Sequence, residues 1–338
     1  MNLVKNTLGL CIALAIPTYA ADLPSVPEKK VSAPDETVKF YGKLNISLQS
    51  SDESSTRINE LKSNASRVGV KGKYKLDHGL TAIYKLEWQV NVDDDDKNTL
   101  TARNQWVGVR GGFGEVTIGR ADTTLKVSQG KFDLFNDYAG DLKHLFIGEN
   151  RVTDSLTYKS PKFNKFQFLA SYILSEDKDK SDPYSIGVTF GDLNLKKTDY
   201  FIAVAHDENM PAKLKETSGS KKTIPLANTR VTGMYKFGDF RIGGIYTETE
   251  LTTTGASETG YAFNASYKIG KALAKVQYQE FAGADGISFG VDYKLGKSTK
   301  VYAWYTDRQG ISYQANTGEE YTLAKEGTYY AIGIQQKF

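Results

Sequence analysis

The chain has 338 residues, with 43 Lys and Arg against 40 Asp and Glu, for a formal net charge of +3. Basic and acidic residues are interspersed, so no basic face accumulates and nucleic-acid binding is not expected. The single cysteine, Cys11, excludes a disulfide framework within the chain. Tyr, Phe and Gly are abundant (21, 16 and 31), a composition that suits strands and their turns. Composition therefore favours an all-β fold.

Residues 1–20 have the pattern of a secretory signal peptide. Lys5 supplies a positive start, Leu8 to Ile16 form an apolar core, and small residues surround a cleavage site after Ala20. Residues 21–37 contain three prolines and follow neither a helix nor a strand period, so we expect a periplasmic N-terminal leader. Residues 38–338 form the predicted barrel domain.

The segment from Val38 to Gln49 alternates strictly. Apolar residues and Gly42 occupy its even positions, and polar residues and Tyr41 occupy its odd positions. A period of two over twelve residues predicts a strand with two different faces. The same signature predicts sixteen strands in all, near residues 38–49, 66–76, 80–92, 101–110, 115–120, 151–160, 166–175, 183–191, 196–206, 227–237, 240–249, 259–269, 271–280, 287–295, 299–307 and 328–338.

Tight links such as 237–240 alternate with longer polar links such as 207–226 and 308–327. No apolar run after the signal peptide approaches the ~18 residues that a membrane helix needs, but strands that cross a bilayer require only ~9–11 alternating residues. In a soluble protein, the apolar face of each of these strands would need to pack against another sheet. In a membrane, the apolar faces contact lipid, and the two edge strands of the sheet must pair with each other to close a barrel. The sequence predicts an antiparallel transmembrane β-barrel of sixteen strands.

The longest interruption in this series is Ala121 to Asn150. Asp133, Asp137 and Asp141 lie inside it, and short strands carrying arginines flank it. We interpret this acidic segment between basic strands as the constriction of a pore.

The last strand places Tyr330, Ile332, Ile334 and the terminal Phe338 on one face. Together with the segments Ser66–Gly72, Gly112–Arg120 and Gly148–Val152, this ending resembles the general porins of Gram-negative outer membranes; Gln336 departs from the usual apolar residue two positions before the end. The resemblance implies a sixteen-stranded barrel, a homotrimer, and a third external loop that folds into the lumen. It also implies that the outer-membrane assembly machinery reads the strand ending in Phe338.

The resemblance further implies a basic wall facing the loop, at Arg67, Arg103 and Arg151. Arg120 shares the parity of apolar neighbours, so we expect it at the barrel exterior or at a subunit contact.

Opposite this wall the loop would present Asp133, Asp137 and Asp141. Their i, i+4, i+8 spacing would place all three carboxylates on one side of a short helical turn. The opposed charges would orient dipolar solutes and bias which ions pass. The alternative is that these residues are ordinary solvated loop charges and strand salt bridges.

The predicted function is that of a general diffusion porin, which gives small hydrophilic solutes and ions a passive route across the outer membrane of a Gram-negative bacterium. Its expected partners are outer-membrane lipid and lipopolysaccharide, and no cofactor or metal is expected. The alternatives are a substrate-selective channel and a structural or adhesive barrel. An enzyme is not expected, because His78, His144 and His206 have no accompanying nucleophile or metal-ligand spacing.

Overall fold

The computed structural model describes residues 36–53, 56–93, 99–175, 181–216, 221–252, 255–314, 320–324 and 326–338. The predicted signal peptide, and the predicted leader as far as residue 35, lie outside these residues. Within the described ranges, none of the helices is both long and apolar enough to cross a membrane.

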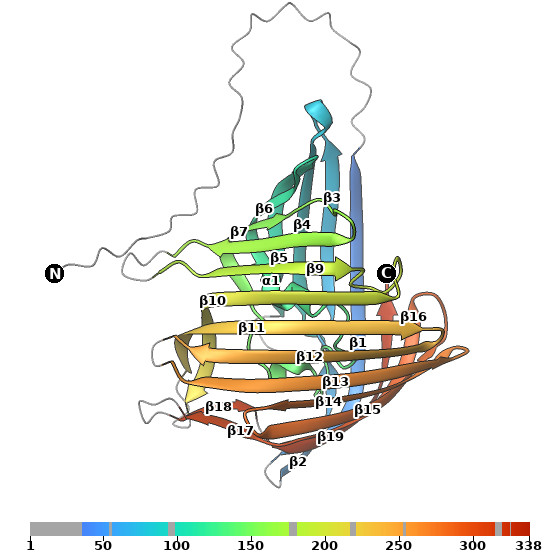
Figure 1. Cartoon of the computed structure of the whole chain (residues 1–338). Helices are drawn as coiled ribbons and strands as arrows, with labels where there is room; N and C mark the ends of the chain where they lie inside the picture. Colours follow the sequence, from blue (N-terminus) through green and yellow to red (C-terminus); the bar gives the residue numbers. More distant parts are fainter. Residues whose placement is uncertain are drawn as a thin grey trace, which may run out of the picture. The chain divides into compact units, whose positions relative to one another are not determined.

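Sixteen antiparallel strands form a closed ring (Figure 1). In order around the ring they are β1 (Thr37–Glu53), β3 (Arg67–Lys75), β4 (Thr81–Val90), β5 (Leu100–Gly111), β6 (Gly114–Asp122), β7 (Arg151–Lys159), β8 (Phe166–Ile173), β9 (Tyr184–Gly191), β10 (Tyr200–Glu216), β11 (Lys221–Phe237), β12 (Phe240–Leu251), β13 (Ser257–Ile269), β14 (Ala272–Phe281), β15 (Ala284–Lys294), β16 (Thr299–Arg308) and β19 (Gly327–Lys337). Each predicted strand corresponds to one of these, which confirms the predicted fold class.

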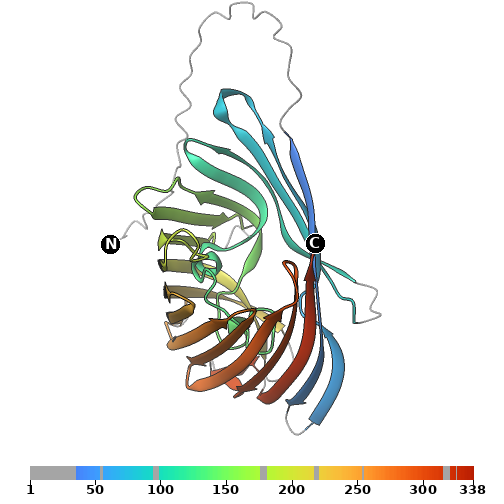
Figure 2. The same cartoon turned by 90° about the vertical axis from the view of Figure 1, so that its right-hand side faces the viewer.

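The ring closes where β19 pairs with β1, in register from Lys43 opposite Lys337 to Asp52 opposite Thr328. Figure 2 shows the C-terminus beside β1. The closure continues to the last residue, because the backbone N–H of Gly42 donates to the carbonyl of Phe338 over 2.9 Å. A Cβ at Gly42 would lie 2.2 Å from the Phe338 ring, so glycine allows this close approach.

Polar side chains fill the interior of the ring and apolar side chains cover its exterior. On β1, Asn45 and Ser47 are buried, while Leu44 and Leu48, which flank this stretch, are exposed. This inverts the usual arrangement of a soluble protein and is the arrangement that a barrel needs when its outer face meets lipid.

One end of the barrel has tight turns, which we call the short-turn end. Gly238 and Gly270 adopt positive φ of 58° and 57° there, in the turns between β11 and β12 and between β13 and β14. The other end, the long-loop end, carries the extended connections. The two ends therefore differ as the link lengths predict.

Three further strands lie outside the predicted set: β2 (Thr56–Ser63), β17 (Ile311–Gln314) and β18 (Glu320–Ala324). β1 pairs with β3 through Thr37–Lys43 and with β2 through Ile46–Glu53, so β2 prolongs the wall beyond β3. The expected polar link 207–226 is instead paired, because β10 and β11 continue through most of it. Strands of 17 residues exceed what a bilayer requires, and their outer parts do not need the apolar alternation by which strands are predicted.

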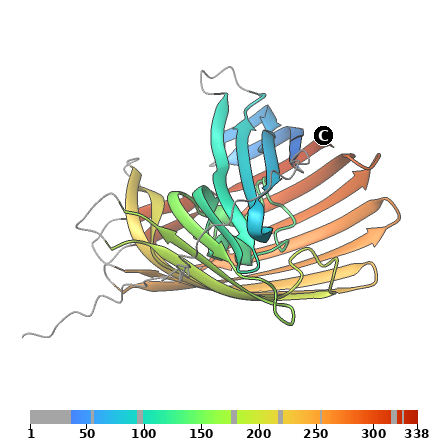
Figure 3. The ribbon, with the colours of Figure 1, turned by 90° about the horizontal axis from the view of Figure 1, so that it is seen from above.

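The helices are short: η1 (Asp77–Gly79), α1 (Thr124–Ser128) and η2 (Leu142–His144). The last two belong to the connection between β6 and β7. Seen from above, the curved wall of strands surrounds this connection (Figure 3).

Candidate functional site

The connection 123–150, which we call the inward loop, leaves and returns at one place. The N–H of Thr123 donates to the carbonyl of Asn150 over 3.2 Å, which draws the two arms together. The Thr123 hydroxyl also accepts from the N–H of Lys126 over 3.3 Å and caps α1. The loop therefore starts as an ordered structure rather than an open strand extension.

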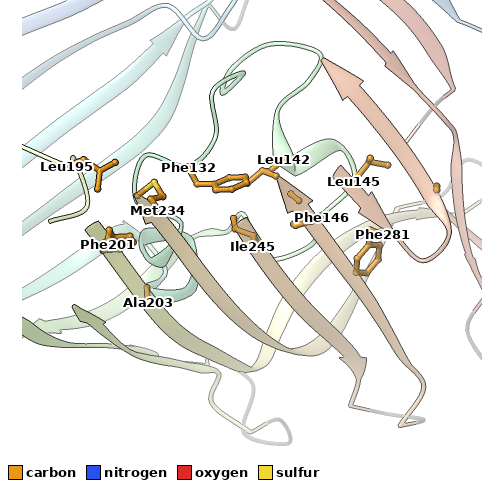
Figure 4. Close-up of a cluster of buried hydrophobic side chains, with 12 residues drawn as sticks. Phe132, Leu142, Leu145, Phe146, Leu195, Phe201, Ala203, Met234, Ile245 and Phe281 are labelled. Atoms are coloured by element: carbon orange, nitrogen blue, oxygen red, sulfur yellow. The ribbon is translucent and has the colours of Figure 1, made fainter. Parts of the chain in front are cut away.

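Apolar side chains hold the inward loop against β10 to β15. Phe132, Leu142, Leu145 and Phe146 are buried in one cluster with lumen-facing residues of these strands, among them Phe201, Ala203, Met234, Ile245 and Phe281 (Figure 4). Complete burial of a large apolar side chain contributes about 1.5–3 kcal/mol. This apolar area in a polar interior fixes the loop inside the barrel.

The tip of the loop packs on a second area of the wall. The ring centroid of Tyr138 lies 5.0 Å from that of Tyr302 and 5.6 Å from that of Trp304. Below it, Nζ of Lys275 donates to the carbonyl of Leu134 over 2.9 Å. Aromatic contacts and a buried lysine thus hold the tip against β14 to β16.

Lumen-facing side chains also satisfy the irregular backbone of the loop. Asn264 donates to the carbonyl of Phe132 over 2.6 Å, and Arg308 donates to that of Ala139 over 2.7 Å. The amide oxygen of Gln277 accepts from the N–H of Leu134 over 3.0 Å. A buried loop without such partners would leave costly unpaired backbone groups.

The three loop aspartates have different environments. The carboxylate of Asp133 accepts from the N–H of Leu142 over 3.1 Å, and that of Asp141 accepts from the N–H of Asp137 over 2.7 Å. Both stabilise turns within the loop. Asp137 is the one that reaches the basic residues of the wall, where its Oδ2 lies 2.7 Å from Nζ of Lys43 and 2.5 Å from Nη2 of Arg67.

The helical turn expected across these aspartates is not formed. α1 ends at Ser128, and the next helical residues are Leu142 to His144. The segment between them is a series of turns in which Asp137 has a φ of 75°. The i, i+4 spacing therefore does not place the three carboxylates on one face.

The three predicted wall arginines each have a carboxylate partner. Besides the contact between Arg67 and Asp137, Nε of Arg103 lies 3.0 Å from Oε1 of Glu87. Nη2 of Arg151 lies 2.9 Å from Oδ1 of Asp122. All three arginines and all three loop aspartates line one cavity of about 490 Å³.

Sequence reasoning missed several charged residues of this region: Lys43, Lys85, Glu87, Asp122 and Lys143. Nζ of Lys85 lies 3.3 Å from Oε2 of Glu87, and Asp122 is the last residue before the inward loop. Lys43, Lys85 and Glu87 share the polar parity of their strands, which could have indicated the lumen side but not the depth in the barrel.

Burial and neighbouring charges shift the pKa values of two carboxyl groups in the inward loop. Burial would raise the pKa of Asp137, but the cations of Arg67 and Lys43 outweigh it and hold the pKa below its usual range. Burial and the neighbouring Asp141 carboxylate raise the pKa of Asp133 well above its usual range. Asp137 is therefore the loop carboxylate that stays charged toward the wall.

Arg120 lies away from this site. It pairs with Gln105 on β5, and Gln105 pairs with the exposed Leu86 of β4, so the register places Arg120 on the outer face of the barrel.

Residues 7–310 match the family described as Gram-negative porin. The chain belongs to this porin family. It is similar to the major outer membrane protein P.IA of Neisseria meningitidis serogroup C, at 27% identity over 329 residues that cover 80% of this chain and 82% of the relative. This porin is thus an outer-membrane protein that provides passive diffusion for small hydrophilic solutes and ions.

Solved structures show the same fold. An anion-selective porin from Comamonas acidovorans superimposes with a TM-score of 0.72 at 19% identity, covering 90% of this porin and 100% of that chain. The trimer form of OmpT, an outer membrane protein of Vibrio cholerae folded in vitro, gives a TM-score of 0.67 at 22% identity, covering 90% and 99%.

Proposed function

We propose that this diffusion porin sorts solutes by size, charge and polarity at the constriction between the inward loop and the wall of β1 and β3 to β7. The observation that carries the proposal is the carboxylate of Asp137, which the loop holds within 2.7 Å of Lys43 and 2.5 Å of Arg67. Acidic loop residues and wall arginines that line one cavity create a transverse field, which favours dipolar solutes over apolar ones.

The constriction itself has little net charge. Its cavity is lined by seven basic and six acidic side chains: Arg67, Lys85, Arg103, Lys126, Lys131, Lys143 and Arg151, and Glu87, Asp122, Asp133, Asp137, Asp141 and Glu149. Sorting there depends on the direction of the electric field across the pore more than on the sign of the net charge. A strong preference for one ion sign would need charges elsewhere in the lumen.

The chain's assembly is proposed to be a homotrimer, as in the trimer form of the OmpT structure. Arg120 and Gln105 are polar residues on the outer face, and an arginine facing lipid at the bilayer midplane costs about 2–4 kcal/mol. We infer that a neighbouring subunit covers this face. The rest of the exterior contacts lipid and lipopolysaccharide, the assembly machinery recognises the strand ending in Phe338, and the barrel has no enzymatic role.

The test is planar-bilayer recording of purified, refolded trimers under a salt gradient, with Arg67, Arg103 and Arg151 each changed to Ala and with residues 131–145 deleted. Ohmic steps in threes, larger after the deletion and shifted toward cations by the Ala variants, are expected. Saturable currents for one solute would favour a substrate-selective channel. Folded trimers without conductance would favour a structural or adhesive barrel.

A further inference from the structure

The strand register places basic residues opposite one another on the lumen face near the short-turn end. Lys337 of β19 lies opposite Lys43 of β1, which lies opposite Arg67 of β3. We call these three residues the upper row. They share the parity of the lumen-facing Asn45 on β1, so their side chains belong to the inside of the barrel.

Four residues closer to the short-turn end, the pattern repeats. Lys39 of β1 lies opposite Lys71 of β3, which lies opposite Lys85 of β4. We call these three residues the lower row. Adjacent strands lie roughly 4.8 Å apart, so each row brings three cations into a span of about 10 Å. Like charges directly opposite each other destabilise a sheet, and the two rows therefore oppose folding rather than assist it.

Only part of this charge is compensated. Lys43 and Arg67 share the Asp137 carboxylate, and Lys85 has Glu87 within 3.3 Å.

The remaining members, Lys39, Lys71 and Lys337, have no carboxylate at ion-pair distance in the part of the chain that the structure describes. Lys71 instead lies over the ring of Tyr41, with Nζ 5.1 Å from its centroid. All three side chains are exposed to water. They are free to meet a ligand in the lumen.

The basic character extends around this mouth. Lys294 of β15 lies opposite Lys300 of β16, and Lys236 of β11 lies opposite Arg241 of β12. Two of these four have carboxylate partners, since Lys300 lies 2.7 Å from Asp292 and Lys236 lies 3.3 Å from Asp199. The rows are therefore part of a wider cationic lining.

The vestibule at the long-loop end differs. Its cavity of about 720 Å³ is lined by three basic and three acidic side chains: Lys62, Lys143 and Arg308, and Glu53, Glu60 and Asp137. Charge in the lumen is thus asymmetric along the pore axis, with the excess of cations at the short-turn end.

The position of the rows decides what can bind them. Side chains on the lumen face cannot reach lipid headgroups around the barrel, so the ligand must enter the pore. Lys39 and Lys71 lie directly opposite each other, about 5 Å apart, whereas Lys337 lies four residues, about 13 Å, farther along the strand direction. Exposed primary ammonium groups spread over this length suit anions with several charges, such as phosphate esters or polycarboxylates. A monovalent anion would gain from only one or two of these groups.

We propose that Lys39, Lys71 and Lys337 form a binding site for multivalent anions that extends from the short-turn mouth toward the constriction. The site concentrates anions at that mouth and makes anion passage unequal in the two directions. This inference rests on the proposed function, since it requires an open pore.

The experiment adds inorganic tripolyphosphate to either side of a single trimer in a planar bilayer at low salt. The described barrel contains no cysteine, so Ser298→Cys in an exposed short turn marks the orientation when an impermeant thiol reagent is added to one side. Tripolyphosphate should reduce the current at about tenfold lower concentration from the short-turn side, because several charges contribute there.

The variant K39Q/K71Q/K337Q should lose this sidedness and the accompanying current rectification. The matched control K62Q/K162Q/K165Q removes the same total charge outside the two rows and should behave as the wild type. Heat-modifiable gel mobility checks that both variants form barrels.

Conducting channels that are inhibited equally from both sides, or a row variant that matches the wild type, would overturn this inference alone. Folded trimers that do not conduct would overturn the proposed function and this inference with it.

Discussion

Nη1 of Arg230 lies 2.6 Å from Oε1 of Glu149, which joins β11 to the returning arm of the inward loop. The Arg230 side chain is fully buried and also donates from Nη2 to the carbonyl of Ile147 over 3.2 Å. The outgoing arm meets the same carboxylate, because Nε2 of Gln129 donates to Oε2 of Glu149 over 2.9 Å. One buried carboxylate thus fixes both arms of the loop to the wall.

Changing Arg230 to Met should loosen the loop. Removing one partner of a buried ion pair costs about 3–5 kcal/mol because the other charge stays buried and unpaired. We expect a lower midpoint of thermal trimer dissociation, together with larger and noisier single-channel currents. The double variant R230M/E149Q removes both charges and should recover part of the stability. Equal losses in the single and double variants would show that the pair is not coupled.

Changing Asp137 to Asn should shift the pore toward anions. The substitution removes the carboxylate that Lys43 and Arg67 share and leaves both cations without this partner. The reversal potential in a salt gradient should move toward the anion equilibrium potential, and the shift should diminish as salt screens the charges.

The matched control is Asp133→Asn, a change of the same chemistry in the same loop. Asp133 accepts hydrogen bonds from the loop backbone and from Gln277, so its loss should affect stability more than ion preference. A reversal potential that moves equally in both variants would contradict the special position of Asp137.

The strands were predictable from sequence because the bilayer imposes the signal. On β1, apolar residues such as Leu44 and Leu48 must alternate with lumen-facing Asn45 and Ser47 wherever the strand crosses lipid. β2 lies where this demand ends, and its sequence carries no period of two. β17 and β18 do alternate, but over only 4 and 5 residues, too short a run to stand out from a polar link. The same limit explains why the paired extensions of β10 and β11 resembled polar loops.

The charged cavity beside the inward loop was predictable only in part. Parity and motif indicated Arg67, Arg103 and Arg151, and all three line the cavity. The partners of these arginines were not predictable, because the depth of Glu87 in the barrel depends on register. The position of the Asp137 carboxylate depends on where the inward loop packs against strands that are distant in the sequence. The spacing of residues within the loop does not determine that position.

Asp133 and Asp137 should respond to pH in opposite ways. Burial and Asp141 raise the pKa of Asp133, so its stabilisation is present below pH ~4 and is lost as the pH rises through the raised pKa. Burial opposes ionisation of Asp137, but Arg67 and Lys43 outweigh it and lower its pKa. The stability that charged Asp137 contributes to the folded barrel is therefore present above pH ~4 and is lost as the pH falls through the lowered pKa. Plots of thermal midpoint against pH for D133N and D137N should diverge from the wild type in opposite directions. Two parallel curves would contradict this assignment.

The closure of the barrel at Gly42 gives a prediction about assembly. A Cβ at this position would meet three ring atoms of Phe338 at 2.2–2.9 Å, so the ring would have to turn away from its place beside the two backbone hydrogen bonds that join these residues. Gly42→Val should therefore lower the yield of refolded barrels and the thermal midpoint of those that form. Gly233→Val is the matched control, because it is also a strand glycine but a Cβ there has nothing within 4 Å. Refolding into detergent, followed by gel mobility and thermal melting, measures both effects. Equal losses at the two positions would attribute the effect to the loss of a strand glycine in general, and not to the contact between the two ends of the barrel.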